Sequence, residues 1–226
     1  MTKIRFRIIV GLSLFIVLAG VAIAGVVYRL FFVRLVRVPQ GAMMNTILLG
    51  DCLTVHRLFG DVKRGSVVVF EYPGDSDRYI ARVVGLPGET IQIRGRSVYI
   101  NGSELPERRV QTKPEDFSDA FDKLEEISSD GDGPYEVFFT SDPEDPTAQQ
   151  PPDEMKFATS SPLSIREGQY FLLGDNKDNS ADSRYRGTVP RELIWGTASV
   201  IYWSSFEDKA THEERVRSER LFKKIK

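Results

Sequence analysis

The candidate groups for acyl transfer in this chain are a few hydroxyls, one thiol and one amine in short turn-like segments. They are Thr46, Ser66, Ser180, Cys52 and Lys177. Attack by a hydroxyl or thiol needs a neighbouring base that accepts its proton. A lysine can serve only when burial lowers its pKa, and we expect Lys177 to be solvated because it lies in a predicted turn. Arg82 is excluded as a base because its guanidinium stays protonated.

Metal and polyanion chemistry are not indicated. The two histidines, His56 and His212, are far apart in the sequence and have no cysteine or acidic neighbour at the spacing of zinc ligands. The formal net charge of -2 gives no general attraction to nucleic acid. The single cysteine, Cys52, excludes an internal disulfide and is typical of a small strand residue. We expect no metal, no cofactor and no nucleic-acid partner.

Three segments carry the most informative pattern, and we call them the first, second and third box. Residues 38–51 read Val-Pro-Gln-Gly-Ala-Met-Met-Asn-Thr-Ile-Leu-Leu-Gly-Asp, residues 78–89 read Arg-Tyr-Ile-Ala-Arg-Val-Val-Gly-Leu-Pro-Gly-Glu, and residues 174–184 read Gly-Asp-Asn-Lys-Asp-Asn-Ser-Ala-Asp-Ser-Arg. In this order they resemble the Ser-Gly-Ser-Met-x-Pro-Thr, Tyr-Ile-Lys-Arg-Val-x-Gly-x-Pro-Gly-Asp and Gly-Asp-Asn-x-x-x-Ser-x-Asp-Ser-Arg boxes of bacterial type I signal peptidases. Each pattern alone is weak, but their joint occurrence in order is highly specific.

The resemblance implies acyl transfer by a serine–lysine dyad, a variant of the triad mechanism. Matched position by position, Ala42 stands at the nucleophile and Ala81 at the general base. Gln40 stands where many relatives have a serine that helps to bind the oxyanion, and Asn45 stands where they have proline. Loss of nucleophile or base costs roughly 10⁶ in turnover in a comparable serine protease. We therefore expect that this chain does not hydrolyse peptide bonds by the family mechanism.

The resemblance also assigns supporting and substrate-binding positions. Ser180 matches the serine that hydrogen-bonds the dyad lysine, although without that lysine a turn hydroxyl bonded to local backbone is the simpler interpretation. Arg82 is a further supporting residue, and an Asp182–Arg184 ion pair is expected to hold the third box against the other two. The family's substrate lies as an added strand in a groove, here formed by Val38, Pro39, Tyr79 and Ile80.

Four readings of the function follow from these residues. The first is an inactive member that binds secretory precursors at their signal peptides, or pairs with an active signal peptidase. The second is an active signal peptidase with an unrecognised nucleophile, and the third is a purely structural membrane protein. The fourth is an engineered double-alanine variant, but the further departures at Gln40 and Asn45 favour natural divergence.

The N-terminal segment predicts a membrane helix. Residues 8–28 carry no charge and are long enough to cross the hydrocarbon core. A cleavable secretory signal ending near Ala22-Ile23-Ala24 is the alternative, but the apolar run is long for such a signal and continues past this point. Flanking charges do not determine the orientation. The resemblance implies a single-pass protein of the bacterial cytoplasmic membrane with its globular domain on the extracytoplasmic side.

The rest of the chain predicts a mainly β fold, an antiparallel domain of the signal peptidase type. Short apolar, β-branched runs separated by Gly, Pro and Asp indicate strands. They cover residues 52–58, 66–72, 79–84, 90–94, 97–100, 169–173 and 197–203. Gly95-Arg96 favours a type II′ hairpin turn. Pro190 is typical of the first position of a helix.

The expected domain order combines these elements with an acidic, Pro- and Ser-rich insertion. Its parts are a basic tail (1–7), an anchor (8–33), the first half of the β-domain (34–105), the insertion (106–165), the second half (166–206) and a charged C-terminal helix (207–226). Within the insertion we expect a short helix at residues 119–127 and a strand at residues 135–139. The insertion is expected to be a solvated surface excursion.

Overall fold

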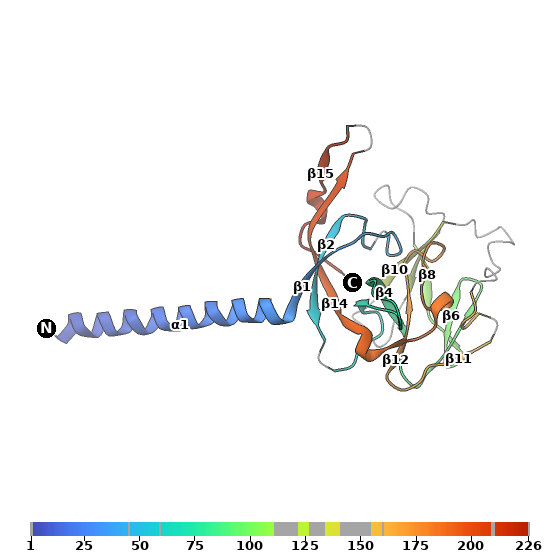
Figure 1. The fold of residues 1–226 in the computed structure, drawn as a ribbon, viewed down its shortest axis with the longest axis horizontal. Coiled ribbons are helices and arrows are strands. Elements are labelled where there is room, and N and C mark those ends of the chain that lie inside the picture. Colours follow the sequence, from blue (N-terminus) through green and yellow to red (C-terminus); the bar gives the residue numbers. More distant parts are fainter. Residues whose placement is uncertain are drawn as a thin grey trace. The chain divides into compact units, whose positions relative to one another are not determined.

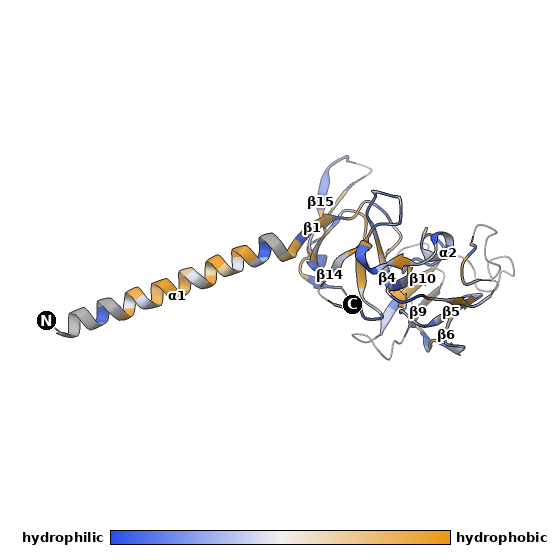
Figure 2. Ribbon diagram, turned by 60° about the horizontal axis from the view of Figure 1, so that its bottom comes forward, coloured by the Kyte–Doolittle hydropathy of each residue, from blue (hydrophilic) through white to orange (hydrophobic). Residues whose placement is uncertain are grey.

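A computed structural model describes residues 2–44, 46–58, 60–110, 122–126, 134–140, 155–159, 161–208 and 211–225. The chain divides into two compact units, Met1–Arg34 and Leu35–Lys226. The first consists mainly of helix α1 (Thr2–Phe32), which contains a 20-residue stretch, Val10–Arg29, long and apolar enough to cross a membrane. Figure 2 shows hydrophobic residues along this helix. The expected anchor segment is therefore helical.

The second unit is built around a large antiparallel sheet (Figure 1). Its main strands are β1 (Val33–Arg37), β2 (Asp51–Arg57), β3 (Val67–Phe70), β4 (Tyr79–Gly85), β12 (Gln169–Leu173), β13 (Val189–Pro190) and β14 (Ile194–Glu207). They lie in the order β1-β2-β14-β3-β4-β12-β13. The long strand β14 pairs with both β2 and β3, and shifts of register along it mark bulges that bend a sheet. Gly196 is required there because a Cβ would collide with the carbonyl of His56.

Strand β3 explains why the core is continuous through the sheet. All four of its residues are buried, with Val68 and Phe70 packed in one hydrophobic cluster and Val67 and Val69 in another. A strand that is covered on both faces is expected to be an uninterrupted apolar run. The sequence Val-Val-Val-Phe therefore forms a central strand whose neighbour, β4, carries position 81.

Two smaller sheets complete the unit. One contains β11 (Leu163–Ser164), β5 (Thr90–Arg94), β6 (Ser97–Ile100) and β7 (Ser103–Glu104), in that order. The other contains β10 (Tyr135–Phe139), β9 (Asp122–Glu126) and β8 (Glu107–Arg109). In the turn between β5 and β6, positive φ is confined to Gly95 at +58°, as the predicted type II′ hairpin requires.

Most predicted strands are confirmed within one or two residues at their ends, and the strand at residues 135–139 is β10. The helix expected at residues 119–127 is wrong for its described part, because Asp122–Glu126 is strand β9, paired with β10. Asp119, Ala120, Phe121 and Ile127 lie outside the described residues. Pro190 ends strand β13, and only the single 3₁₀ turn η1 (Arg191–Leu193) follows it.

The expected C-terminal helix is also wrong. Residues 207–226 contain β15 (Glu214–Val216), the 3₁₀ turn η2 (Ser218–Arg220) and β16 (Lys223–Lys224). Strands β15 and β16 both pair with β14, and the Phe222 N–H donates to the Ile201 carbonyl. Tertiary hydrogen bonds to a strand edge outweigh the weak helical preference of the charged residues. The end of β14 and β15 form a projecting hairpin arm (Figure 1).

Candidate active-site cavity

The three boxes meet at one small cavity of about 40 Å³. Ala42 lines it from the turn after β1, Ala81 from β4, and Ser180 from the loop after β12. Apolar walls come from Val38, Met43, Phe70 and Ile80, and further lining comes from Pro39, Gln40, Arg78, Tyr79, Ala181 and Asp182. Sequence positions 42 and 81 are therefore brought together by the fold. A space of this size holds a small side chain or a few water molecules.

Backbone contacts fix the turn that carries Ala42. The Val38 N–H donates to the Asp51 carbonyl at 2.8 Å, and the Gly50 N–H donates back to Val38 at 3.1 Å. Met43 is buried in the core and its carbonyl accepts from Ile47, which closes one turn of chain. The Ala42 carbonyl accepts the Asn176 N–H at 3.0 Å. The first box is thereby tied directly to the third.

Asp175 connects all three boxes through its carboxylate. It accepts hydrogen bonds from Arg82 Nε at 2.7 Å and Arg82 Nη2 at 2.5 Å, both from the second box, and from Thr46 Oγ1 of the first box at 2.6 Å. Burial alone would lower the pKa of Arg82, but the charge and hydrogen bonds of Asp175 outweigh it and raise that pKa. Arg82 also donates to the Gly65 carbonyl. This buried pair is the main link between the boxes, and we did not predict it.

The expected Asp182–Arg184 ion pair exists, with Nε and Oδ1 2.8 Å apart, but its position corrects the prediction. Asp182 caps the short helix α2 (Ser183–Arg186) and accepts the Gly174 N–H. Arg184 donates to the Lys177 carbonyl at 2.6 Å. These partners all belong to the third box, so the pair stiffens that box and Asp175 performs the joining role that we expected of it.

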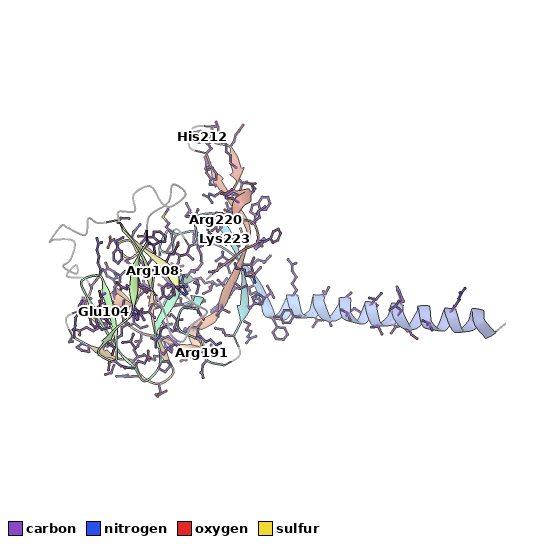
Figure 3. The ribbon with its side chains drawn as sticks, turned by 180° about the vertical axis from the view of Figure 1, so that it is seen from behind. Glu104, Arg108, Arg191, His212, Arg220 and Lys223 are labelled. Carbon is purple, nitrogen blue, oxygen red and sulfur yellow. The ribbon has the colours of Figure 1, made fainter. Side chains whose placement is uncertain are left out.

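A second carboxylate, Asp51, holds the end of the first box against the C-terminal segment. It accepts from Arg220 Nη2 at 2.6 Å, from Ser204 Oγ at 2.6 Å and from the Leu48 N–H at 2.8 Å. Arg220 also donates to the Thr46 carbonyl at 3.0 Å. Figure 3 places Arg220 near the base of the hairpin arm and His212 at its tip. The sequence offered only the Gly-Asp turn as a signal for this contact.

The other candidate nucleophiles and bases do not line the cavity. Thr46 donates to Asp175, and Cys52 lies in β2 opposite Trp203. The expectation that Lys177 is solvated is wrong, because Lys177 is buried and its Nζ lies 3.0 Å from Glu126 Oε1 on strand β9. Its counterion comes from the sheet of β8, β9 and β10, and the sequence alone does not indicate that this sheet lies beside Lys177. Asn45 lies outside the described residues.

Close packing around Gly174 leads to a test of this arrangement. A Cβ at Gly174 would lie 2.6 Å from the Ala42 carbonyl oxygen and would also meet the Ser180 side chain. We expect Gly174→Ala to lower the free energy of unfolding by about 1–3 kcal/mol, because the two loops must separate. The exposed replacement Asn179→Ala in the same box should change it by less than about 0.5 kcal/mol. Equal stability of the two variants in denaturant titration would contradict this packing.

Glu107 gives the unit a pH-dependent stability. It pairs with Glu126 across strands β8 and β9, and burial, followed by the charge of Glu126, raises its pKa to about 7 from 4.5, while Lys177 opposes the shift. The folded state thus holds a proton that the unfolded chain releases between these values. The contribution is favourable at low pH and is lost as pH rises through 7. Glu107→Gln should remove this loss, so the difference in unfolding free energy between variant and wild type should grow from pH 5 to pH 8. A constant difference would refute the shift.

Residues 9–203 match the family described as signal peptidase, peptidase S26. Signal peptidase I of Pseudomonas fluorescens is 31% identical over 213 residues, which cover 82% of this chain and 70% of that protein. Signal peptidase I of Aquifex aeolicus is 30% identical over 215 residues, covering 82% of each. The chain therefore belongs to the signal peptidase S26 family, whose named relatives process signal peptides.

A solved signal peptidase I from Enterococcus faecalis is 26% identical and covers 62% of this chain and 98% of its own length, with a TM-score of 0.35. The fold described above rests on the strand pairing of this chain itself.

Proposed function

We propose that this chain is a membrane-anchored member of its family that binds the signal-peptide region of secretory precursors without hydrolysing it. The observation that carries the proposal is the cavity in which Ala42 and Ala81 meet. A methyl group neither attacks a carbonyl nor accepts a proton, and these two positions match the family's nucleophile and base.

The other described residues around the cavity do not replace the missing dyad. Their hydroxyls are those of Ser180 and Tyr79, and Tyr79 already donates to Asp75 Oδ2 at 2.7 Å. The cation among them is Arg78, whose guanidinium is not a base at neutral pH. The described lining residues include no lysine, and the carboxylate among them, Asp182, is already engaged by Arg184 and the Gly174 N–H. An active enzyme with a substitute dyad at this cavity is thus not supported.

Peptide binding needs only backbone groups, and these are available beside the cavity. Tyr79, Ile80 and Ala81 pair with β3 on one side, while β12 pairs with β4 only from Arg82 onward. Strand β1 lies at the other end of the same sheet and has β2 as its neighbour. An extended peptide could add to these free edges as a new strand. The small apolar cavity suits a residue such as alanine.

The membrane setting is part of the same proposal. Helix α1 is expected to cross the bacterial cytoplasmic membrane once, with the β-domain outside, where precursors emerge. An active signal peptidase is a further candidate partner, since an inactive relative that retains precursors could deliver them.

Binding can be tested with a fluorescent Ala-x-Ala signal-peptide fragment and the full-length protein in detergent. We expect saturable anisotropy, and at least tenfold weaker binding for Ala42→Val, which fills the cavity. The exposed replacement Asn179→Ala, in the third box but outside the lining of the cavity, is the control and should bind as wild type does. Absence of saturable binding would contradict the proposal and leave a structural role instead.

A further inference from the structure

The cavity continues into an outer groove of different character. This outer groove, of about 540 Å³, shares Pro39, Gln40, Arg78 and Ile80 with the cavity, so the two form one continuous depression. Its polar lining comes from Arg37, Gln40, Ser76, Asp77 and Arg78. The inner cavity is mostly apolar. One occupant would therefore meet a small apolar space at one end and charged groups at the other.

The two arginines of the outer groove keep donors free for a ligand. Their carboxylate neighbours among the described residues are 3.9 Å away, Glu214 for Arg37 and Glu71 for Arg78. Ion pairs this long between exposed side chains contribute little. The guanidinium of Arg78 is held 3.6 Å above the ring of Trp195, which orients it before any ligand binds.

The charge of this groove favours an acidic side chain. Arg37 and Arg78 contribute two positive charges and Asp77 one negative charge, so the lining carries a net charge of +1. The backbone N–H of Asp77 donates to Asp75, which fixes the loop that carries it. A carboxylate would complement both guanidinium groups, whereas a lysine would meet repulsion.

The spacing along the strands gives the position of that carboxylate. Arg78 precedes Ala81 by three residues and Arg37 precedes Ala42 by five. An extended peptide beside β4 advances at about 3.3 Å per residue, as β4 does, so its residue near Arg78 lies about three positions from the one in the cavity. The chain leaves β1 at Arg37 and turns at Gly41, so the separation of five residues from Arg37 to Ala42 gives the upper limit of the offset. The acidic residue of the peptide would therefore lie three to five positions from the small residue that occupies the cavity.

We propose that Arg37 and Arg78 make this chain select extended peptides that carry an acidic side chain three to five positions from a small residue. This inference rests on the proposed function, because it takes the same peptide-binding edges as given. It narrows the ligand from signal-peptide segments in general to those that combine a small residue with a nearby negative charge.

The test compares four fluorescent peptides on the full-length protein in detergent. One is a neutral Ala-x-Ala peptide, two carry aspartate four positions before or after the central small residue, and one carries lysine at the better of these positions. We expect one aspartate peptide to bind roughly fivefold more tightly than the neutral peptide and the lysine peptide to bind more weakly. The gain should shrink in high salt because the groups are exposed.

Matched variants assign the effect to the arginines. Arg78→Gln and Arg37→Gln should each reduce the aspartate gain and the double variant should abolish it, while Arg57→Gln, an exposed arginine on β2 outside the groove, should leave it intact. Tight binding of the neutral peptide with no aspartate gain, or a gain that survives in the double variant, would overturn this inference alone. Loss of all peptide binding would instead overturn the proposed function.

Discussion

Replacing Ala42 by serine and Ala81 by lysine in one protein is expected to create cleavage of a signal-peptide precursor. The two side chains would enter the same cavity, where the lysine would be largely desolvated and could release its proton near neutral pH. Restoring a nucleophile and base should raise the turnover rate roughly 10⁶-fold. The absence of the usual oxyanion serine at Gln40 should lower that rate roughly 10²–10³-fold. The gain in rate should therefore be roughly 10³–10⁴ above the wild-type background.

The single variants are the controls for this expectation. Ala42→Ser lacks a base and Ala81→Lys lacks a nucleophile, so neither should exceed the background. Product formation by the double variant should rise with pH, because only the neutral amine accepts the serine proton. Mass spectrometry of the product then gives the rate and the cut site. A double variant that folds and binds peptide but never cleaves would show that the cavity does not have dyad geometry.

The second large effect is expected at Asp175. Asp175→Asn removes the charge that compensates buried Arg82 and weakens the contact to Thr46. A buried guanidinium that has lost its two-bonded carboxylate partner should lower the free energy of unfolding by about 3–5 kcal/mol. Denaturant titration of the full-length protein measures this loss. The peptide affinity should fall as well, because the three boxes would no longer be held together.

Two comparisons separate this effect from general damage. Arg215→Gln breaks a partly exposed ion pair with Asp208 and should cost less than about 1 kcal/mol. Arg82→Met combined with Asp175→Asn should cost less than the sum of the two single variants, since no unpaired charge is then buried. Additive losses would mean that the pair does not act as a unit.

The strands were predictable where the local pattern and the tertiary context agree. Residues Val67–Phe70 are apolar, β-branched and bounded by turns, and both of their faces are buried. The hairpin at Gly95 followed from turn chemistry alone, because only one position needs positive φ. Such elements depend mainly on short-range information, and they include the strand that carries Ala81.

The wrong predictions concern residues whose structure depends on contacts with distant parts of the chain. The pattern of the C-terminal residues predicts a charged helix, but in the structure these residues form backbone hydrogen bonds with the edge of β14. The sequence predicts that Lys177 is a solvated turn residue, but Glu126, 51 residues earlier in the chain, supplies a buried counterion. Nothing in the local sequence around Lys177 indicates a partner in an insertion of another composition.

In the candidate site, too, some residues were predicted from the sequence and others were found only in the structure. Ala42 and Ala81 were assigned by their matched boxes, and both residues line one cavity in the structure. Asp175, which joins the boxes, and Asp51, which holds the first box against the C-terminal segment, were not singled out, because an aspartate after glycine is equally typical of a plain turn. Their partners lie on distant segments and became visible only in the fold.

Incubation of the wild-type chain with a secretory precursor in detergent, followed by mass spectrometry, is the most direct measurement of the central claim. The precursor should be recovered intact in the presence of a stoichiometric excess of the protein. The Ala42→Val variant, prepared in parallel, accounts for any contaminating peptidase. A shortened product that forms with wild type and not with this variant would contradict the claim that the cavity between Ala42 and Ala81 lacks a working nucleophile and base.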